Sequence, residues 1–435
     1  GGALLAHTIA GLLDSRRRLT EPARLFAPFA PDHAGGHTLR PFYRAQMAGK
    51  RVLIADDVRN TGQTFERCAA LVTQAGGTVV GTVEICDRLE AIVDLGVPNI
   101  AVAEPAAGDQ RAIDLDGFYA LHPALAPLKN IYDKGQLAIV HAAGSPDNTR
   151  SHFDAQDYME IGTPGIKTTP DGWLNRYLTE KSIADSPFHG VALGAQTPRM
   201  LAGAAPTLSL SSIEEFRLRN QSMTSALQRL YANSGDTLLQ KGANSLFDAM
   251  ARLRQIEAKI PASSAAYPNG KLAIGLRQIA RLIKAEVGLE IAFAEIDGWD
   301  THVAEGGATG QLANRLKELG DGLAAFHQDL GDRMEDVMLV TMSEFGRTAR
   351  ENGNRGTDHG HANVMFVMGG KVRGGKVHGR WPGLAPEVLY EGRDLDLTTD
   401  YRLVCSEVIS RHLGQRDVSK VFPGFAGGNS LGIVV

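Results

Sequence analysis

The chain has 435 residues with 45 basic and 49 acidic side chains, which leave a formal charge of −4 at pH 7. Because no long run carries one sign, neither nucleic acid nor an anionic membrane surface is expected as a main partner. No apolar run reaches the roughly eighteen residues that span a bilayer, and no charged-then-apolar export signal opens the chain. The sequence as given predicts a cytoplasmic globular protein, or a periplasmic one if an export signal precedes it in the parent protein.

The 43% hydrophobic content and the chain length are sufficient for two or three domains with separate cores. The three cysteines are far apart and have no CxxC spacing: Cys68, Cys86 and Cys405. This spacing predicts buried reduced thiols rather than a disulfide framework or a thiolate metal site.

Helix and strand patterns alternate over the first hundred or so residues. Helices are predicted at residues 3–13 and 64–75, and strands at residues 52–55, 78–85 and 100–102. This βαβ order predicts a parallel sheet with covering helices. The string PAAGDQ after residue 104 is typical of a linker, which we assign to residues 105–111.

The remainder of the chain is again predicted to be α/β. Strands are predicted at residues 137–142, 290–295, 337–341 and 364–368, and helices at residues 211–260, 271–287 and 310–330. The predicted fold class is therefore α/β, as two three-layer α/β/α units at residues 1–104 and 112–435. A helical insertion is expected at residues 205–265 of the second unit.

Residues 52–64, VLIADDVRNTGQT, combine a buried strand, two acids and a helix start. Asp56 and Asp57 are predicted at the carboxyl end of the strand, where open α/β sheets place their ligands. Thr61, Gly62, Gln63 and Thr64 then supply backbone N–H groups and hydroxyls suited to a phosphate. The two acids are suited to ribose hydroxyls, directly or through magnesium. An ordinary capped turn is the alternative, but it leaves the consecutive acids unexplained.

This segment resembles the type I phosphoribosyltransferases, most closely the orotate phosphoribosyltransferase type. The strings GGTVVGTVEICDR and LGVPNIAVAEP extend the resemblance over residues 1–104. It implies that Asp56 and Asp57 contact the ribose of a phosphoribosyl compound and that residues 61–64 hold the 5′-phosphate. It also implies a basic mobile loop near residues 28–48, and an earlier strand and diphosphate loop that would precede residue 1. We therefore expect a segment truncated at its N-terminus that binds rather than transfers.

In the second part, polar residues follow the strand predicted at residues 137–142. The string AAGSPDNTRSHF places Ser145 and then Thr149, Arg150, Ser151 and His152 at the strand end and the next helix start. A hydroxyl beside an Arg and a helix N-terminus is suited to attack a phosphoryl or sulfuryl group. Thr149 and Ser151 are both candidate nucleophiles, with Arg150 and the later Arg347 as anion-binding groups. A helix N-cap with a solvated Arg is the alternative.

Acidic and histidine side chains follow the later strands as well. The predicted metal ligands are Asp300, His302, Glu344, Asp358, His359 and His361. A single histidine would usually be structural, but several beside carboxylates at equivalent strand ends indicate a divalent ion. Zinc, magnesium, manganese and calcium all suit such ligands, and the identity of the ion stays open.

Residues 112–435 resemble a bacterial family of unknown function, often exported by the twin-arginine route, within the alkaline phosphatase and sulfatase superfamily. The strings DGWLNRYL, GWDTH, SEFGRT and GTDHGHANVMFVMGGKVRGG carry the resemblance. It implies that Asp300 and His302 form a ligand pair and that His361 is the last histidine ligand. Ser343 and Glu344 stand where most members carry Asp-His, and the first strand of that fold is missing upstream.

Together these features predict a metal-dependent hydrolase of a small phosphate or sulfate ester. A phosphoribosyl diphosphate-binding module without hydrolase activity is the first alternative. A non-catalytic fusion or truncated product is the second.

Overall fold

The computed structural model describes residues 29–31, 37–39, 41–59, 63–76, 78–87, 111–181, 187–217, 223–257 and 263–435. The chain divides into two compact units. The first comprises residues 1–101 with loops 301–305 and 349–358, and the second comprises the remainder. The elements expected at residues 3–13 and 100–102 and the linker over 105–110 lie outside the described residues.

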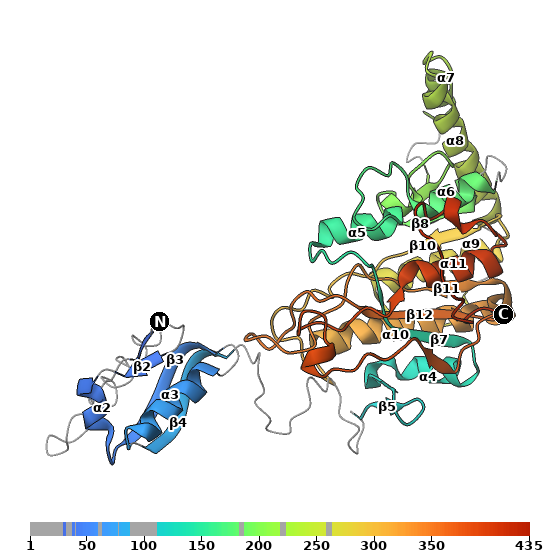
Figure 1. Cartoon of the computed structure of the whole chain (residues 1–435). Helices are drawn as coiled ribbons and strands as arrows, with labels where there is room; N and C mark the ends of the chain where they lie inside the picture. The colour runs from blue at the N-terminus through green and yellow to red at the C-terminus, as the bar shows by residue number, and fades with distance from the viewer. Residues whose placement is uncertain are drawn as a thin grey trace. The chain divides into compact units, whose positions relative to one another are not determined.

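The first unit contains a parallel strand pair joined by a helix (Figure 1). Strands β3 (Arg51–Arg59) and β4 (Thr78–Asp87) pair in parallel, and α3 (Gln63–Gln74) connects them. This confirms the predicted βαβ order. The strand end predicted at residue 55 was wrong, because β4 continues far enough to pair with β3 up to Arg59. Asp56 and Asp57 therefore lie inside the strand and not beyond it.

The described part of residues 28–48, where a basic mobile loop was expected, contains regular secondary structure, and the mobility of the segment stays a prediction. Strands β1 (Phe29–Pro31) and β2 (His37–Leu39) form an antiparallel pair. Helix α2 (Pro41–Met47) follows and begins on a proline, whose fixed φ suits the first helical position. Two short strands and a helix thus make up the described part of this segment.

The second unit contains two main groups of strands. A mixed sheet has the order β11-β12-β7-β13, and β14 also pairs with β7. Its strands are β7 (Leu137–Gly144), β11 (Met338–Val340), β12 (Asn363–Gly369), β13 (Lys376–His378) and β14 (Thr399–Asp400). A parallel sheet has the order β10-β8-β9, formed by β8 (Gly190–Leu193), β9 (Leu208–Leu210) and β10 (Ile291–Phe293). A short antiparallel pair, β5 (Ile113–Asp114) and β6 (Ala120–Leu121), precedes them.

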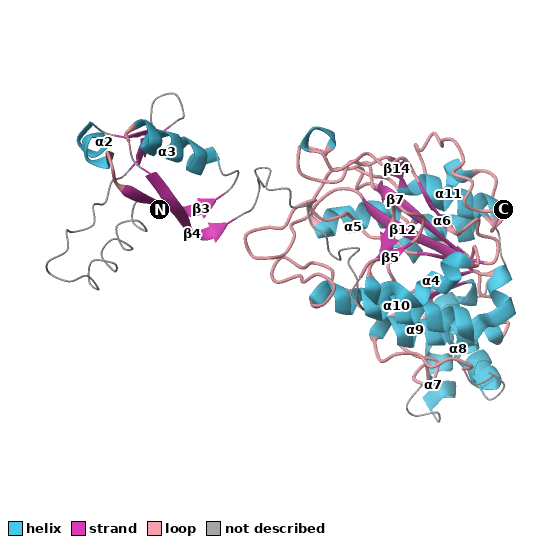
Figure 2. Ribbon diagram, turned by 90° about the horizontal axis from the view of Figure 1, so that it is seen from below, coloured by secondary structure: helices cyan, strands magenta, loops and turns pink. Residues whose placement is uncertain are grey.

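The strands lie between two groups of helices because their side chains alternate between two apolar cores. Leu137 and Ile139 of β7 pack in one core with α4 (Ala126–Asp133), α9 (Lys271–Lys284) and α10 (Gln311–Leu330). Ala138 and Val140 pack in the other with α6 (Trp173–Glu180) and α11 (Tyr401–Arg411). Figure 2 shows α9 and α10 on one side of β7 and β12, with α6 and α11 on the other. The period-two pattern of buried strands thus produces both cores.

The predicted strands and long helices of this unit are present with shifted ends. The expected helical insertion differs more, because residues 205–265 begin with strand β9 before α7 (Thr224–Ala232) and α8 (Thr237–Glu257). These two helices project from the rest of their unit (Figure 1). Cys68 and Cys405 are buried and form no disulfide among the described residues. In the described part of the chain, no helix has the length and apolarity to cross a membrane.

Candidate functional site

The candidate site is formed where the loop after β11 lies against the loop that leads into β12. Gly346 N–H donates to the His361 carbonyl at 2.7 Å, and Gly360 N–H donates to the Gly346 carbonyl at 2.8 Å. A Cβ atom at either glycine would collide with the backbone of the opposite loop, at Ala362 and at Arg347 respectively. Only glycine permits this close approach. The approach places Arg347 opposite His359 in an antiparallel bridge.

His152 is the first residue of α5 (His152–Ile161), the helix that follows β7. Its Nδ1 atom lies 2.7 Å from Oε1 of Glu344, and Ser343 Oγ donates to the other oxygen of that carboxylate at 3.1 Å. The carboxylate can only accept, so Nδ1 carries a proton. The opposite ring atom, Nε2, lies 3.3 Å from Oδ2 of Asp300.

His359 approaches the same aspartate from the loop before β12. Its Nδ1 atom donates to the Arg150 carbonyl at 2.7 Å, and its Nε2 atom lies 3.0 Å from Oδ1 of Asp300. Arg347 also donates to this Oδ1 at 2.6 Å. Phe345 packs against both imidazoles, with ring centroids 4.8 Å from each. Both histidines therefore have one nitrogen held by the protein and the other directed at Asp300.

His152, Asp300 and His359 could hold a metal ion. Each offers one ligand atom, and these atoms all lie within 4.8 Å of one another. His152 Nε2 is buried and has no hydrogen-bond partner of good geometry among the described residues. When Nδ1 of a neutral imidazole is protonated, Nε2 presents a lone pair. Two such lone pairs facing one carboxylate need a proton or a cation between them.

The predicted ligands divide into several groups. Asp300 and His359 belong to the cluster just described, whereas Glu344 contacts His152 and orients it. His302 pairs with Asp358 at 2.9 Å within the loops grouped with the first unit. His361 is buried, directs Nε2 to the Ser145 carbonyl at 3.1 Å and stacks on Tyr390.

His152 was not predicted as a ligand, although it directly follows the candidate nucleophile Ser151. The sequence signal for His152 was its position at the start of a helix that follows a buried strand. The candidate nucleophiles had already been assigned to that position. Residue spacing alone did not connect His152 with the strings GWDTH and GTDHGH. The contact of His152 with Asp300 and His359 depends on how three loops fold.

The nucleophile candidates lie around the start of α5. Ser151 is its N-cap and accepts from Asp154 N–H at 3.5 Å, as the alternative explanation expected. Thr149 Oγ1 accepts from Ser151 N–H at 3.3 Å. Arg150 keeps 29% of its side chain exposed but is held by ion pairs with fully buried Asp394 at 2.6 Å and with Glu391 at 2.7 Å. Its side chain thus fixes the loop, and its carbonyl fixes His359.

The predicted phosphoribosyl site is described only in part. Asp56 and Asp57 lie in β3, while Gln63 and Thr64 begin α3. Thr61 and Gly62 lie outside the described residues, as does Arg40 of the expected basic loop. Their assignment to ribose and phosphate stays a prediction.

Comparison with known proteins finds short matches to phosphoribosyltransferases. Orotate phosphoribosyltransferase from Pelotomaculum thermopropionicum is 33% identical over 102 residues, which are 23% of this chain and 48% of that protein. Orotate phosphoribosyltransferase from Bartonella quintana is 37% identical over 79 residues. The match covers 18% of this chain and 41% of that protein. Adenine phosphoribosyltransferase from Maricaulis maris is 34% identical over 103 residues. The match covers 22% of this chain and 59% of that protein. The chain thus spans about half the length of the curated relatives it matches.

No solved structure matches the chain. The model of one protein family matches residues 136–420, well over half of the chain and most of the second unit. The match includes all three residues of the candidate metal cluster together with Glu344 and Arg347. The chain therefore belongs to the family described as "Protein of unknown function (DUF1501)".

Proposed function

We propose that the second unit is a metal-dependent hydrolase of a phosphate or sulfate ester, with the ion held by His152, Asp300 and His359. The observation that carries the proposal is the convergence of two imidazole Nε2 atoms on one carboxylate. Their Nδ1 atoms are held by a carboxylate and a carbonyl, the usual outer-shell partners of metal-bound histidines. Three protein ligands leave positions open, as in catalytic zinc sites.

The surrounding charges favour an anionic substrate. Arg347 lies against Asp300 and keeps 22% of its side chain exposed, which places a positive charge beside the proposed ion. The N-terminus of α5, where His152 sits, adds unpaired N–H groups and a favourable dipole. A divalent ion at this position would polarise an ester oxygen or lower the pKa of a bound water. Glu344 keeps His152 in the tautomer that presents Nε2.

Thr149 and Ser151 remain the candidate nucleophiles. Each hydroxyl oxygen already accepts one backbone N–H, which fixes its position but leaves its proton available for transfer. An alanine variant that keeps bound metal and loses ester turnover would identify the attacking group. If both variants keep turnover, the attacking group is water.

The test begins with full-length protein stripped by a chelator and dialysed against zinc, manganese, magnesium or calcium. Bound metal is measured by elemental analysis, and turnover by release of p-nitrophenol from its phosphate and sulfate esters. We expect about one ion per chain in the wild type and none in Asp300→Asn or His152→Ala. His189→Ala is the matched control, because His189 also directs Nδ1 to a carbonyl, that of Gly288 at 2.7 Å. Absence of bound metal from the wild type would reject the site, and absence of turnover in metal-loaded protein would reject the hydrolase.

We propose, as a second function, that the first unit binds a phosphoribosyl compound. The parallel β3-α3-β4 unit and the phosphoribosyltransferase relatives support this proposal. Phosphoribosyl diphosphate with magnesium should raise the melting temperature, and Asp57→Ala should abolish the rise. An unchanged melting temperature of the wild type in the presence of phosphoribosyl diphosphate and magnesium would contradict this proposal.

A further inference from the structure

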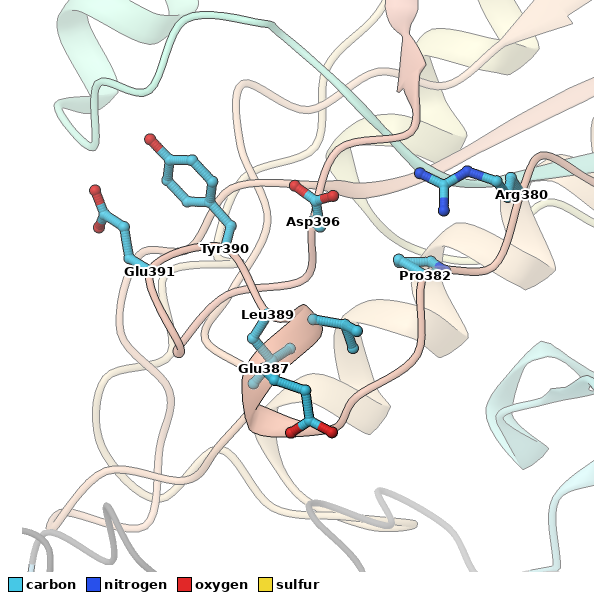
Figure 3. A pocket seen from close by; sticks show the side chains of 8 residues that line it. Arg380, Pro382, Glu387, Leu389, Tyr390, Glu391 and Asp396 are labelled. Atoms are coloured by element: carbon cyan, nitrogen blue, oxygen red, sulfur yellow. The ribbon is translucent and has the colours of Figure 1, made fainter.

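A pocket of about 430 Å³ lies beside the segment between β13 and β14, apart from the three ligand residues of the proposed centre. This volume falls within the range of small-molecule sites. The lining residues combine both charges with an apolar surface: Arg380, Pro382, Glu387, Val388, Leu389, Tyr390, Glu391 and Asp396. Figure 3 shows the Arg380 guanidinium extending in the direction of Asp396, which lies on another part of the segment between β13 and β14.

Within the described residues, the charges of Arg380 and Asp396 have no partner. Neither side chain makes a hydrogen bond or ion pair within the parts of the chain that the structure describes, either with another residue or with each other. Other charges in this segment are engaged, since Glu391 pairs with Arg150 and Arg393 pairs with Asp394. A separated positive and negative group across a pocket therefore remains available to a ligand.

Both walls of the pocket are held in place. On the Arg380 side, Trp381 packs on Tyr119 and His141, and the Arg380 carbonyl accepts from Thr398 Oγ1 at 2.9 Å. On the other side, Tyr390 and Asp394 exchange backbone hydrogen bonds of 2.9 and 3.0 Å, and Asp394 is fully buried. A pocket with fixed walls loses little entropy when a ligand binds.

We propose that this pocket binds a small zwitterion of the α-amino acid class with an aliphatic side chain. Its carboxylate would pair with the planar guanidinium of Arg380, which matches carboxylate geometry. Its ammonium would pair with Asp396, and its aliphatic part would lie against Pro382, Val388 and Leu389. Glu387 adds a second acid, which favours the ammonium end further.

The probe is L-leucine, titrated against full-length protein by calorimetry and by ligand-observed NMR in the presence of a chelator. Two matched compounds each lack one charge: 4-methylpentanoate lacks the ammonium, and 3-methylbutylamine lacks the carboxylate. We expect saturable L-leucine binding and at least about tenfold weaker binding of either analogue, the size of one lost charged hydrogen bond. Arg380→Gln and Asp396→Asn should each weaken L-leucine binding to a similar degree. Lys376→Gln, an exposed cation of β13, should leave it unchanged.

Three results would overturn the proposal. These are no saturable binding of L-leucine up to about 10 mM, equal binding of a one-charge analogue, or wild-type affinity in both pocket variants. Because the chelator removes any bound ion, the result does not depend on the proposed hydrolase. Repeating the titration with Asp300→Asn separates the two sites, since that variant should bind L-leucine normally.

Discussion

Asp300 and Asp329 lie in the same unit, but different kinds of hydrogen-bonding groups surround their carboxylates. Asp329 is fully buried at the end of α10, and its oxygens accept from Lys284, Tyr267 and the Ser264 N–H at 2.6, 3.2 and 2.7 Å. Asp300 keeps 43% of its side chain exposed and contacts two imidazole nitrogens in addition to Arg347. The partners of Asp329 are all hydrogen-bond donors, whereas the imidazoles at Asp300 can present lone pairs.

This difference separates a structural carboxylate from the carboxylate that we propose as a metal ligand. Burial works to raise the pKa of Asp329, but the Lys284 ammonium and the Ser264 N–H outweigh it and hold that pKa below its ordinary value. Asp329 therefore needs nothing from outside the protein. At Asp300, neutral imidazoles protonated on Nδ1 would face the carboxylate with lone pairs, which repel it unless a proton or a cation lies between them. A buried carboxylate with satisfied donors contributes stability, and an exposed one with facing lone pairs indicates a site.

The largest expected effect is on folding and tests the structural half of this comparison. Asp329→Ala should lower the free energy of unfolding by about 3–5 kcal/mol, because it leaves the Lys284 ammonium buried and unpaired. Asp300→Ala, measured with a chelator present, should change it by less than about 1 kcal/mol. Urea denaturation followed by circular dichroism measures both. Equal losses in the two variants would contradict the distinction.

The pH dependence of unfolding sharpens the same contrast. Because the pKa of Asp329 is lower in the folded state, its contribution is complete above the ordinary aspartate pKa of about 4. It is lost as the pH falls through the lowered pKa of the folded protein. Melting temperatures should therefore fall less steeply between about pH 5 and pH 2 in Asp329→Asn than in the wild type. Asp332→Asn, at an exposed carboxylate nearby, should keep the wild-type slope.

Sequence patterns predicted the elements whose side chains repeat with a clear period. The buried run that became β7 and the amphipathic patterns of α9 and α10 were found within a few residues of their ends. The two strand groups and the mixed order of β11, β12 and β7 were not predicted, since strand pairing depends on contacts distant in sequence. Asp329 itself gave no signal, because a polar residue near the end of an amphipathic helix is normally exposed.

The residue types of the cluster were predicted, but which of those residues lie together was not. The strings GWDTH and GTDHGH correctly indicated histidines beside carboxylates, and Asp300 and His359 do meet. His302 and Asp358 belong to the same strings yet pair with each other. Which histidine of a string contacts Asp300 depends on the loop path through Gly346 and Gly360, and residue spacing alone does not specify that path.

The smallest of these effects separates a ligand from a residue that orients one. Glu344 contacts Nδ1 of His152 and not the Nε2 atom that faces Asp300, so Glu344→Gln should weaken metal binding about 10- to 100-fold without abolishing it. Ser343 is one hydrogen bond farther away, and Ser343→Ala should weaken binding less than about fivefold. Competition with a fluorescent chelator measures both affinities against Asp300→Asn, which should not bind. Complete loss of binding in Glu344→Gln would place Glu344 among the ligands, and wild-type affinity would remove it from the site. A graded series would mean that the effect of a substitution falls with each bond that separates the residue from the ion.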